Sequence, residues 1–388
     1  MQIWIILVIV IVIIVLIGVL LLLSWKNTIN TPIIELNKST TNNLDYFSTN
    51  NILVSSTKLN QDNFFVYNPS IQWNNNEKTE IMTIARVSGH TMIPRLKNCI
   101  QSHSRSNRID LTDIEGLQDY LDIFGEQKGG ASGVVKYMIH TQKYSTVTAT
   151  LLNPFYSKEN LCKKNYQGFE DPRVFRFNQK LWIICYFRGK NFPYPSLVDT
   201  SKFGHYIIIF PLDMSVNPVL LHYADRQKLE KNWMPFEYNN KLYVVYSISP
   251  HKILHVDIHT GNCTKIFETK NPNSPKEDIG NGSPPQLITI NGNRYYLGMG
   301  HIRGRINGDM IRKNFLYLFE STPPFSVVSV SKVFNILSSF IPIEFGSGLL
   351  VDEENQYVYV SFGIDDCSGS IIKIPIPEVI ALLPIKSL

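Results

Sequence analysis

The sequence predicts an all-β fold, a five-bladed β-propeller that is preceded by one N-terminal transmembrane helix. Three observations lead to this prediction: a long apolar run at the start of the chain, five similar segments along the rest of it, and a composition rich in aromatic residues. The 388 residues include 19 Tyr and 21 Phe. Aromatic and β-branched side chains are enriched in strands, so this composition favours sheets over helices.

The composition also excludes several classes of protein. Charged residues make up 18% and hydrophobic residues 44% of the chain, whereas a disordered chain combines few apolar groups with high net charge. The net charge of +5 comes without a dense Lys/Arg stripe, so we expect no nucleic-acid partner. The five cysteines show no Cys-x-x-Cys or Cys/His metal spacing, so we expect no metal site.

The N-terminal run is long enough to cross a membrane. Residues 3–23 are apolar and would span about 31 Å as a helix, with Trp4 and Trp25 near the two interfaces. A cleavable signal peptide is the alternative, but it usually has a basic start and a shorter apolar region. We therefore predict a single-pass anchor over residues 1–26, in which residues 3–23 contact the lipid bilayer.

A stem is predicted to follow the anchor. Residues 27–61 are rich in Asn, Thr and Ser, which is typical of a flexible spacer. Lys26 alone would place the globular domain in the cytoplasm by the positive-inside rule. Glycosylation sequons at Asn37, Asn262 and Asn281 are instead compatible with a lumenal or extracytoplasmic domain, and this is the location that we expect.

The globular domain, residues 62–388, contains an internal repeat. Five segments begin at residues 68, 170, 232, 282 and 345. Each has an apolar strand, a polar turn and an aromatic or β-branched strand, and a further strand pair follows. Turns such as Asn178-Gln179 and Asn239-Asn240 are typical of hairpins. Four-stranded units that recur at about 50 residues predict propeller blades, and a β-sandwich is the alternative.

One interval between repeats is longer than the others. It contains an insertion over about residues 95–131. Apolar residues at helical spacing over residues 111–124 predict a helix there, and we expect the insertion to cover one face of the propeller as a lid.

Polar residues that close the repeated strands are the candidate site residues. The innermost strands of a propeller face its central channel, so these side chains should converge there. They mix cations with few carboxylates, which suits a phosphate beside a sugar and one acid, Asp171, that moves a proton. Arg173 could instead lock the blade by pairing with Glu170. The candidate substrate- and phosphate-binding residues are Asn68, Arg86, Glu170, Arg173, Lys231, His251, His301 and Asp366.

Several short motifs resemble glycoside hydrolase family 130. They are Asn68-Pro69-Ser70, Ala85-Arg86, GFEDPR at residues 168–173, GSPP at residues 282–285, Gly300-His301 and GIDD at residues 363–366. The resemblance covers all five segments in order. It implies a five-bladed propeller that acts on β-mannosides, mostly as a phosphorylase, with relatives that are mannosyltransferases.

The resemblance also implies roles for individual residues. Asp171 matches the general acid of that family, which protonates the leaving oxygen through a sugar hydroxyl while phosphate attacks with inversion. Phosphate-binding cations are implied at Arg86, Lys231 and His251, and contacts to sugar hydroxyls at Asn68 and Asp366. The sequence departs from the family at Ala85-Arg86, where Tyr-Arg is usual, and at Pro250-His251-Lys252, where His-Arg is usual.

The sequence therefore predicts a membrane-anchored carbohydrate-active enzyme that performs mannosyl transfer or phosphorolysis with inversion. Its substrate would be an oligosaccharide or glycoconjugate, with inorganic phosphate or a sugar 1-phosphate as co-substrate and no other cofactor. A non-catalytic glycan-binding propeller is one alternative. The other is an inverting hydrolase, which needs two carboxylates about 6.5–9.5 Å apart. Its carboxylates would come from Glu170, Asp171, Glu237 and Asp366.

Overall fold

The computed structural model describes ten stretches of the chain. They are residues 52–57, 64–89, 108–110, 114–115, 132–140, 149–152, 166–306, 309–337, 343–366 and 368–385. The predicted anchor over residues 1–26 lies outside them, as does most of the stem and of the insertion. Within these stretches no helix has both the length and the apolar character needed to cross a membrane.

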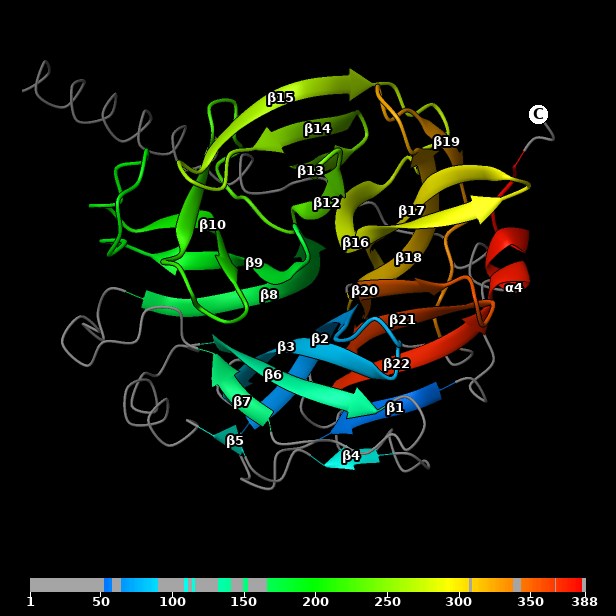
Figure 1. Cartoon of the computed structure of the whole chain (residues 1–388), viewed down its shortest axis with the longest axis horizontal. Coiled ribbons are helices and arrows are strands. Elements are labelled where there is room, and N and C mark those ends of the chain that lie inside the picture. The colour runs from blue at the N-terminus through cyan, green and yellow to red at the C-terminus, as the bar shows by residue number, and fades with distance from the viewer. Residues whose placement is uncertain are drawn as a thin grey trace, which may run out of the picture.

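The regular secondary structure of the described residues is almost entirely strand, with one short helix, which confirms the all-β prediction. They form five four-stranded antiparallel sheets, here called blades I to V, that follow one another around a common axis (Figure 1). Blade I contains β2 (Phe64–Trp73), β3 (Glu80–Gly89), β6 (Ser132–His140) and β7 (Ala149–Leu152). Blade II contains β8 (Tyr166–Phe177), β9 (Lys180–Gly189), β10 (Gly204–Pro211) and β11 (Val219–Tyr223).

The remaining blades repeat this order. Blade III contains β12 (Met234–Tyr238), β13 (Lys241–Ile248), β14 (His251–Val256) and β15 (Asn262–Thr269). Blade IV contains β16 (Asp278–Ile290), β17 (Asn293–Ile306), β18 (Asp309–Glu320) and β19 (Val327–Val330). Blade V contains β20 (Glu344–Asp352), β21 (Tyr357–Ile364), β22 (Ser368–Pro375) and β1 (Ile52–Thr57), and α4 (Ile376–Ala381) follows β22.

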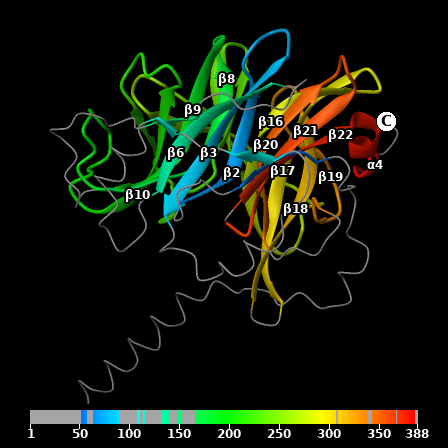
Figure 2. The same cartoon turned by 90° about the horizontal axis from the view of Figure 1, so that it is seen from below.

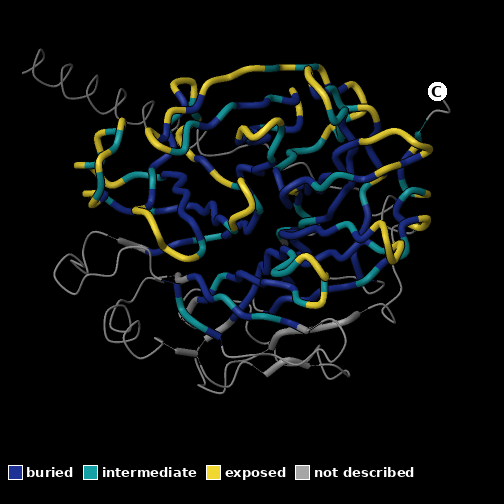
Figure 3. The backbone as a smooth tube through the Cα atoms, viewed as in Figure 1, coloured by how far each residue is buried: buried dark blue, intermediate teal, exposed yellow. Residues whose placement is uncertain are grey.

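The innermost strands of the blades form a closed ring. β2 contacts β8 and β20, β12 contacts β8 and β16, and β16 contacts β20. Five hydrophobic clusters of described residues fill the spaces between neighbouring blades. One cluster lies in each of the pairs I–II, II–III, III–IV, IV–V and V–I. Buried backbone accordingly lines the middle of each blade (Figure 3). Each sheet therefore buries both faces against its neighbours, which explains the continuous apolar runs in strands such as β9 and β21.

The ring closes with a strand from the predicted stem. β1 pairs antiparallel with β22, so residues 52–57 supply the outer strand of blade V. The boundary predicted at residue 62 is therefore too late, because an unpaired outer edge of blade V can accept one more strand of backbone hydrogen bonds. Two short strands of the insertion also join blade edges: β4 (Arg108–Asp110) runs parallel to β1, and β5 (Ile114–Glu115) runs parallel to β7. The helix predicted over residues 111–124 is thus wrong at Ile114 and Glu115.

Candidate active site

Breaks in strand register bring polar side chains to the axis. Four innermost strands, β2, β8, β16 and β20, shift register partway along their length. Asn68 and Asp171 lie inside two of these bulges with positive φ values of 51° and 47°, and Asn232, just before β12, has a φ of 57°. Asn and Asp adopt this left-handed conformation more readily than other residues, and a bulge redirects a side chain out of the regular alternation.

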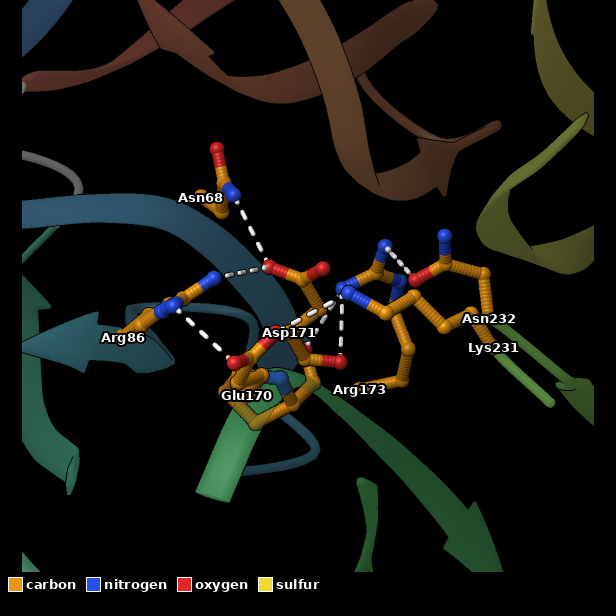
Figure 4. Close-up of polar contacts among 8 residues, drawn as sticks. Asn68, Arg86, Glu170, Asp171, Arg173, Lys231 and Asn232 are labelled. Atoms are coloured by element: carbon orange, nitrogen blue, oxygen red, sulfur yellow. Dashed lines mark hydrogen bonds and ion pairs between the residues drawn. The ribbon is translucent and has the colours of Figure 1, made fainter. Parts of the chain in front are cut away.

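Asp171 lies at the centre of the resulting cluster (Figure 4). Its Oδ1 accepts a hydrogen bond of 2.9 Å from Asn68 Nδ2 and lies 3.7 Å from an Arg86 guanidinium nitrogen. Its Oδ2 has no hydrogen-bond partner within the described part of the chain. The side chain is 10% exposed. One oxygen is therefore held in place while the other is available to a substrate.

The surroundings of Asp171 keep its carboxyl group ionised. Burial alone would raise its pKa, but the positive charges of Arg86, Lys231 and Arg173 and the hydrogen bond from Asn68 outweigh burial. Together they hold the pKa of Asp171 well below its usual range. At neutral pH Asp171 is therefore a carboxylate, which can accept a proton.

Two cations beside Asp171 share a second carboxylate. Glu170 lies 3.3 Å from a guanidinium nitrogen of Arg86 through Oε1 and 3.0 Å from Lys231 Nζ through Oε2. Arg86 also stacks over the ring of Tyr67 at 5.2 Å. Lys231 Nζ lies 4.7 Å from the centroid of the Tyr186 ring. This arrangement holds two positive groups next to the catalytic candidate, where an incoming anion could bind both.

Arg173 links blades at the level of the site. It is 1% exposed, and its guanidinium donates to the backbone oxygens of Asp171 at 3.0 Å, Pro172 at 2.9 Å and Gly282 at 2.6 Å. It also donates to Asn232 Oδ1 at 3.2 Å. No contact with Glu170 is among these bonds, so the pairing considered from the sequence is not formed. Its donors are directed at the protein, which favours a structural role over a phosphate contact.

His251 does not join the cluster. It is fully buried in β14, the third strand of blade III, where its Nδ1 lies 2.9 Å from the backbone oxygen of Phe325 and its ring packs against Phe319. Burial lowers the pKa of His251 to about 4. The sequence interpretation placed His251 at the end of the second strand, but that strand ends at Ile248 and His251 starts the next one. Its predicted role in phosphate binding is therefore not supported.

The other predicted residues are divided between the axis and the periphery. His301 is 4% exposed in β17 and packs edge-on against Phe345 at 5.0 Å. Asp366 lies near Arg86. Burial lowers the pKa of the Arg86 guanidinium, but Tyr67, Glu170, Asp171 and, to a smaller extent, Asp366 raise it, and the net result is a raised pKa. Glu237 lies at the far end of β12, where it accepts a hydrogen bond from the backbone of Asn178 in the hairpin of blade II.

Sequence reasoning did not select Tyr186 and His205. The Tyr186 hydroxyl contacts His205 Nδ1, and the pair lies beside Lys231. Burial and the nearby Glu170 raise the pKa of Tyr186, so its hydroxyl stays protonated. Tyr186 lies in the interior of β9 and His205 in β10, the third strand of blade II, so a search for polar residues that close the repeated strands did not select them. Among the described residues, no group of His, Cys, Asp and Glu side chains could hold a metal ion.

Comparisons with known proteins give limited matches. No family model matches the chain. A 140-residue segment is 27% identical to β-mannosyltransferase 2 of Komagataella phaffii, and the match covers 33% of this chain and 20% of that protein. The chain therefore spans about a fifth of the length of this curated relative.

Similar solved structures include three proteins with related names. A β-1,2-mannobiose phosphorylase from Listeria innocua is 15% identical, with a TM-score of 0.45 over 84% of this chain and 94% of that chain. A mannose phosphorylase from Leishmania mexicana is 13% identical, with a TM-score of 0.48 over 84% and 89%. A GDP-Man-dependent mannosyltransferase from the same organism is 13% identical, with a TM-score of 0.44 over 84% and 91%.

Proposed function

We propose that the chain is a membrane-anchored enzyme that transfers mannosyl groups with inversion, from a phosphate-activated donor to an oligosaccharide or glycoconjugate. Asp171 is the proton-transferring residue, and Arg86 and Lys231 bind the phosphate group. The observation that carries this proposal is an ionised, partly free carboxylate beside two cations at the axis. The names of the relatives supply the sugar.

The proposed transfer step follows from these positions. The hydroxyl oxygen of the acceptor attacks the anomeric carbon of the donor, and the bond between that carbon and the phosphate oxygen breaks. The phosphate leaves with the bonding electrons and is stabilised by Arg86 and Lys231. The proton of the acceptor passes to Asp171, directly or through a sugar hydroxyl. Phosphorolysis is the reverse of this step and needs Asp171 in its protonated form.

Transfer is better supported than hydrolysis. An inverting hydrolase needs a second carboxylate that activates water. Glu170 is bound to Arg86 and Lys231, and Glu237 lies at the other end of its strand. Neither is placed as a free base opposite Asp171, and Asp366, near Arg86, is the remaining carboxylate that a hydrolase could use. Transfer from a phosphate donor needs one carboxylate, Asp171 as base, because Arg86 and Lys231 stabilise the leaving phosphate.

The test is an assay of the purified full chain with mannose 1-phosphate or GDP-mannose and mannooligosaccharide acceptors. We expect elongated acceptor and released phosphate or nucleotide, and Asp171→Asn should lower kcat about 10²–10⁴-fold. The matched control is Glu237→Gln, which changes a carboxylate outside the cluster and should leave kcat unchanged. Glycan binding without turnover would indicate a binding propeller, and full activity of Asp171→Asn would contradict the role of that residue.

A further inference from the structure

Two arginines face each other across the hairpin formed by the second and third strands of blade IV. Arg303 in β17 and Arg312 in β18 are direct partners in the antiparallel register. Directly opposed residues place their side chains on the same face of the sheet, and like charges in that position are destabilising. The hairpin that carries them extends beyond the ends of its neighbouring strands (Figure 2). The fold therefore holds two positive charges together at the end of blade IV.

His301 adds a third nitrogen-bearing group to the same face. It precedes Arg303 by two residues in the same strand, and its ring is 4% exposed. Its Nδ1 is buried without a hydrogen-bond partner in the described chain, and so is the Nε of Arg312. Burial, followed by the charges of Arg312, Arg303 and Arg173, holds the pKa of His301 well below its usual range. These groups are thus close enough to repel one another.

The negative charge near this group is small. Arg303 pairs with Asp278 at 2.9 Å, where both side chains are partly exposed. No ion pair of Arg312 is found in the described part of the chain. A buried or half-buried cation normally has a counter-ion, because removing it from water is costly otherwise. The arrangement is therefore one that an external anion would complete.

The position of the group links it to the active-site cluster. The guanidinium carbons of Arg312 and Arg173 lie 5.5 Å and 5.2 Å from the centroid of the same ring, that of Phe345. Arg173 in turn donates to the backbone oxygen of Asp171. Arg312 therefore lies on the side of blades IV and V, separated from the Asp171 cluster by the Phe345 ring and Arg173, whereas Arg86 and Lys231 come from blade I and from the segment before blade III.

We propose that Arg303, Arg312 and His301 form a second anion site, which binds a phosphate group of a substrate. With one phosphate at Arg86 and Lys231, a second phosphate at this site fits either a donor with a diphosphate or an acceptor that is itself phosphorylated. The identity of the substrate rests on the proposed function, but the binding of phosphate does not. The two sources share one chemistry and are separated by the experiment below.

The first experiment measures phosphate binding in the Asp171→Asn background, where turnover is expected to be slow. Titration with inorganic phosphate, followed by calorimetry and ³¹P NMR, should give two sites per chain. Arg312→Gln should remove one site and Arg86→Gln the other. Without phosphate at low salt, Arg312→Gln should also raise the melting temperature by about 1–2 °C, because it relieves the cross-strand repulsion. The control is Arg294→Gln, an exposed arginine at the other end of β17, which should change neither quantity.

The second experiment assigns the phosphate. Arg312→Gln in the otherwise native chain should raise KM at least tenfold for GDP-mannose but not for mannose 1-phosphate if the donor supplies it. A rise confined to a phosphorylated acceptor assigns the site to the acceptor. Unchanged phosphate stoichiometry in Arg312→Gln would overturn the site itself. An unchanged KM both for GDP-mannose and for a phosphorylated acceptor would overturn its assignment to a substrate. If no donor is turned over, the proposed function fails while the phosphate titration still decides the site.

Discussion

Replacing Arg173 by Met separates a structural role from a phosphate-binding role for this arginine. Methionine keeps most of the volume of the side chain and removes its charge and its donors. The guanidinium is fully buried, and although burial lowers its pKa to about 10, it remains charged at neutral pH. Its bonds reach the backbone of blades II and IV and the side chain of Asn232. We therefore expect the variant to lose stability throughout the propeller.

The magnitude follows from the acceptors that the variant leaves behind. The backbone oxygens of Asp171, Pro172 and Gly282 all lose a charged donor, and an unsatisfied buried acceptor costs about 1–3 kcal/mol. The relief of burying one charge offsets part of this loss, so we expect the free energy of unfolding to fall by about 4 kcal/mol. For a domain of this size about 2 °C corresponds to 1 kcal/mol, so the melting temperature should fall by about 8 °C.

The assay is thermal and urea unfolding of the wild type and two variants, together with phosphate titration of each. The control is Arg176→Met on the same strand, whose guanidinium donates to the backbone oxygens of Gln179 and Trp73 near the surface. We expect it to lose no more than about 1 kcal/mol. An unchanged melting temperature of Arg173→Met together with a tenfold loss of phosphate affinity would refute the structural role and make Arg173 a ligand.

Three further variants test the geometry of the site. Arg86→Met removes the strongest charge that opposes burial of Asp171, so the pKa of Asp171 should rise and the acidic limb of the pH–rate profile should move up by at least about one unit; an unmoved limb contradicts this. Gly363→Ala would make its Cβ clash with Asn68 Oδ1 and displace the amide that holds Asp171, so kcat should fall about 10²-fold. When Gly363→Ala is combined with Asn68→Ala, the two losses of kcat should not add, because both act on the same amide. Additive losses would exclude this shared cause. His251→Gln tests burial of a neutral imidazole. Because the folded-state pKa of about 4 is below the unfolded value, the free energy of unfolding of the wild type should fall by up to about 3 kcal/mol as pH falls from 6.5 to 4. The variant should lose less, as measured by urea unfolding. Equal losses in both proteins would show that His251 does not titrate in this way.

The repeated pattern made the blades and much of the site predictable. Each blade needs an apolar inner strand and a polar hairpin, and these leave a readable sequence signal wherever both faces of a sheet are buried. Asn68 and Asp171 precede prolines within this pattern, and the structure places both in register bulges. Equivalent positions in a pseudo-symmetric ring converge on its axis. The neighbours Arg86, Glu170 and Lys231 are brought together for the same reason.

Other features depend on distances along the chain that a local pattern does not contain. β1 pairs with β22, and these strands are more than 300 residues apart. His251 shows a second kind of error, because a difference of a few residues in strand register moves a side chain from the end of one strand into the core of the next. The opposition of Arg303 and Arg312 also depends on the register of one long hairpin. Register is set by packing of the whole blade, so these pairings could not be predicted from a local sequence pattern.

The charges around Asp171 also bear on the direction of the proposed reaction. In the absence of a ligand, Arg86 and Lys231 hold Asp171 in its ionised form, which is the form that accepts a proton during transfer. A phosphate dianion bound between these cations would cancel much of their positive charge. The pKa of Asp171 would then rise, because burial, the largest opposing effect, would no longer be outweighed. A phosphate held by these cations would therefore raise the proton affinity of Asp171, which favours uptake of the acceptor's proton during transfer and supplies the acid form needed for phosphorolysis.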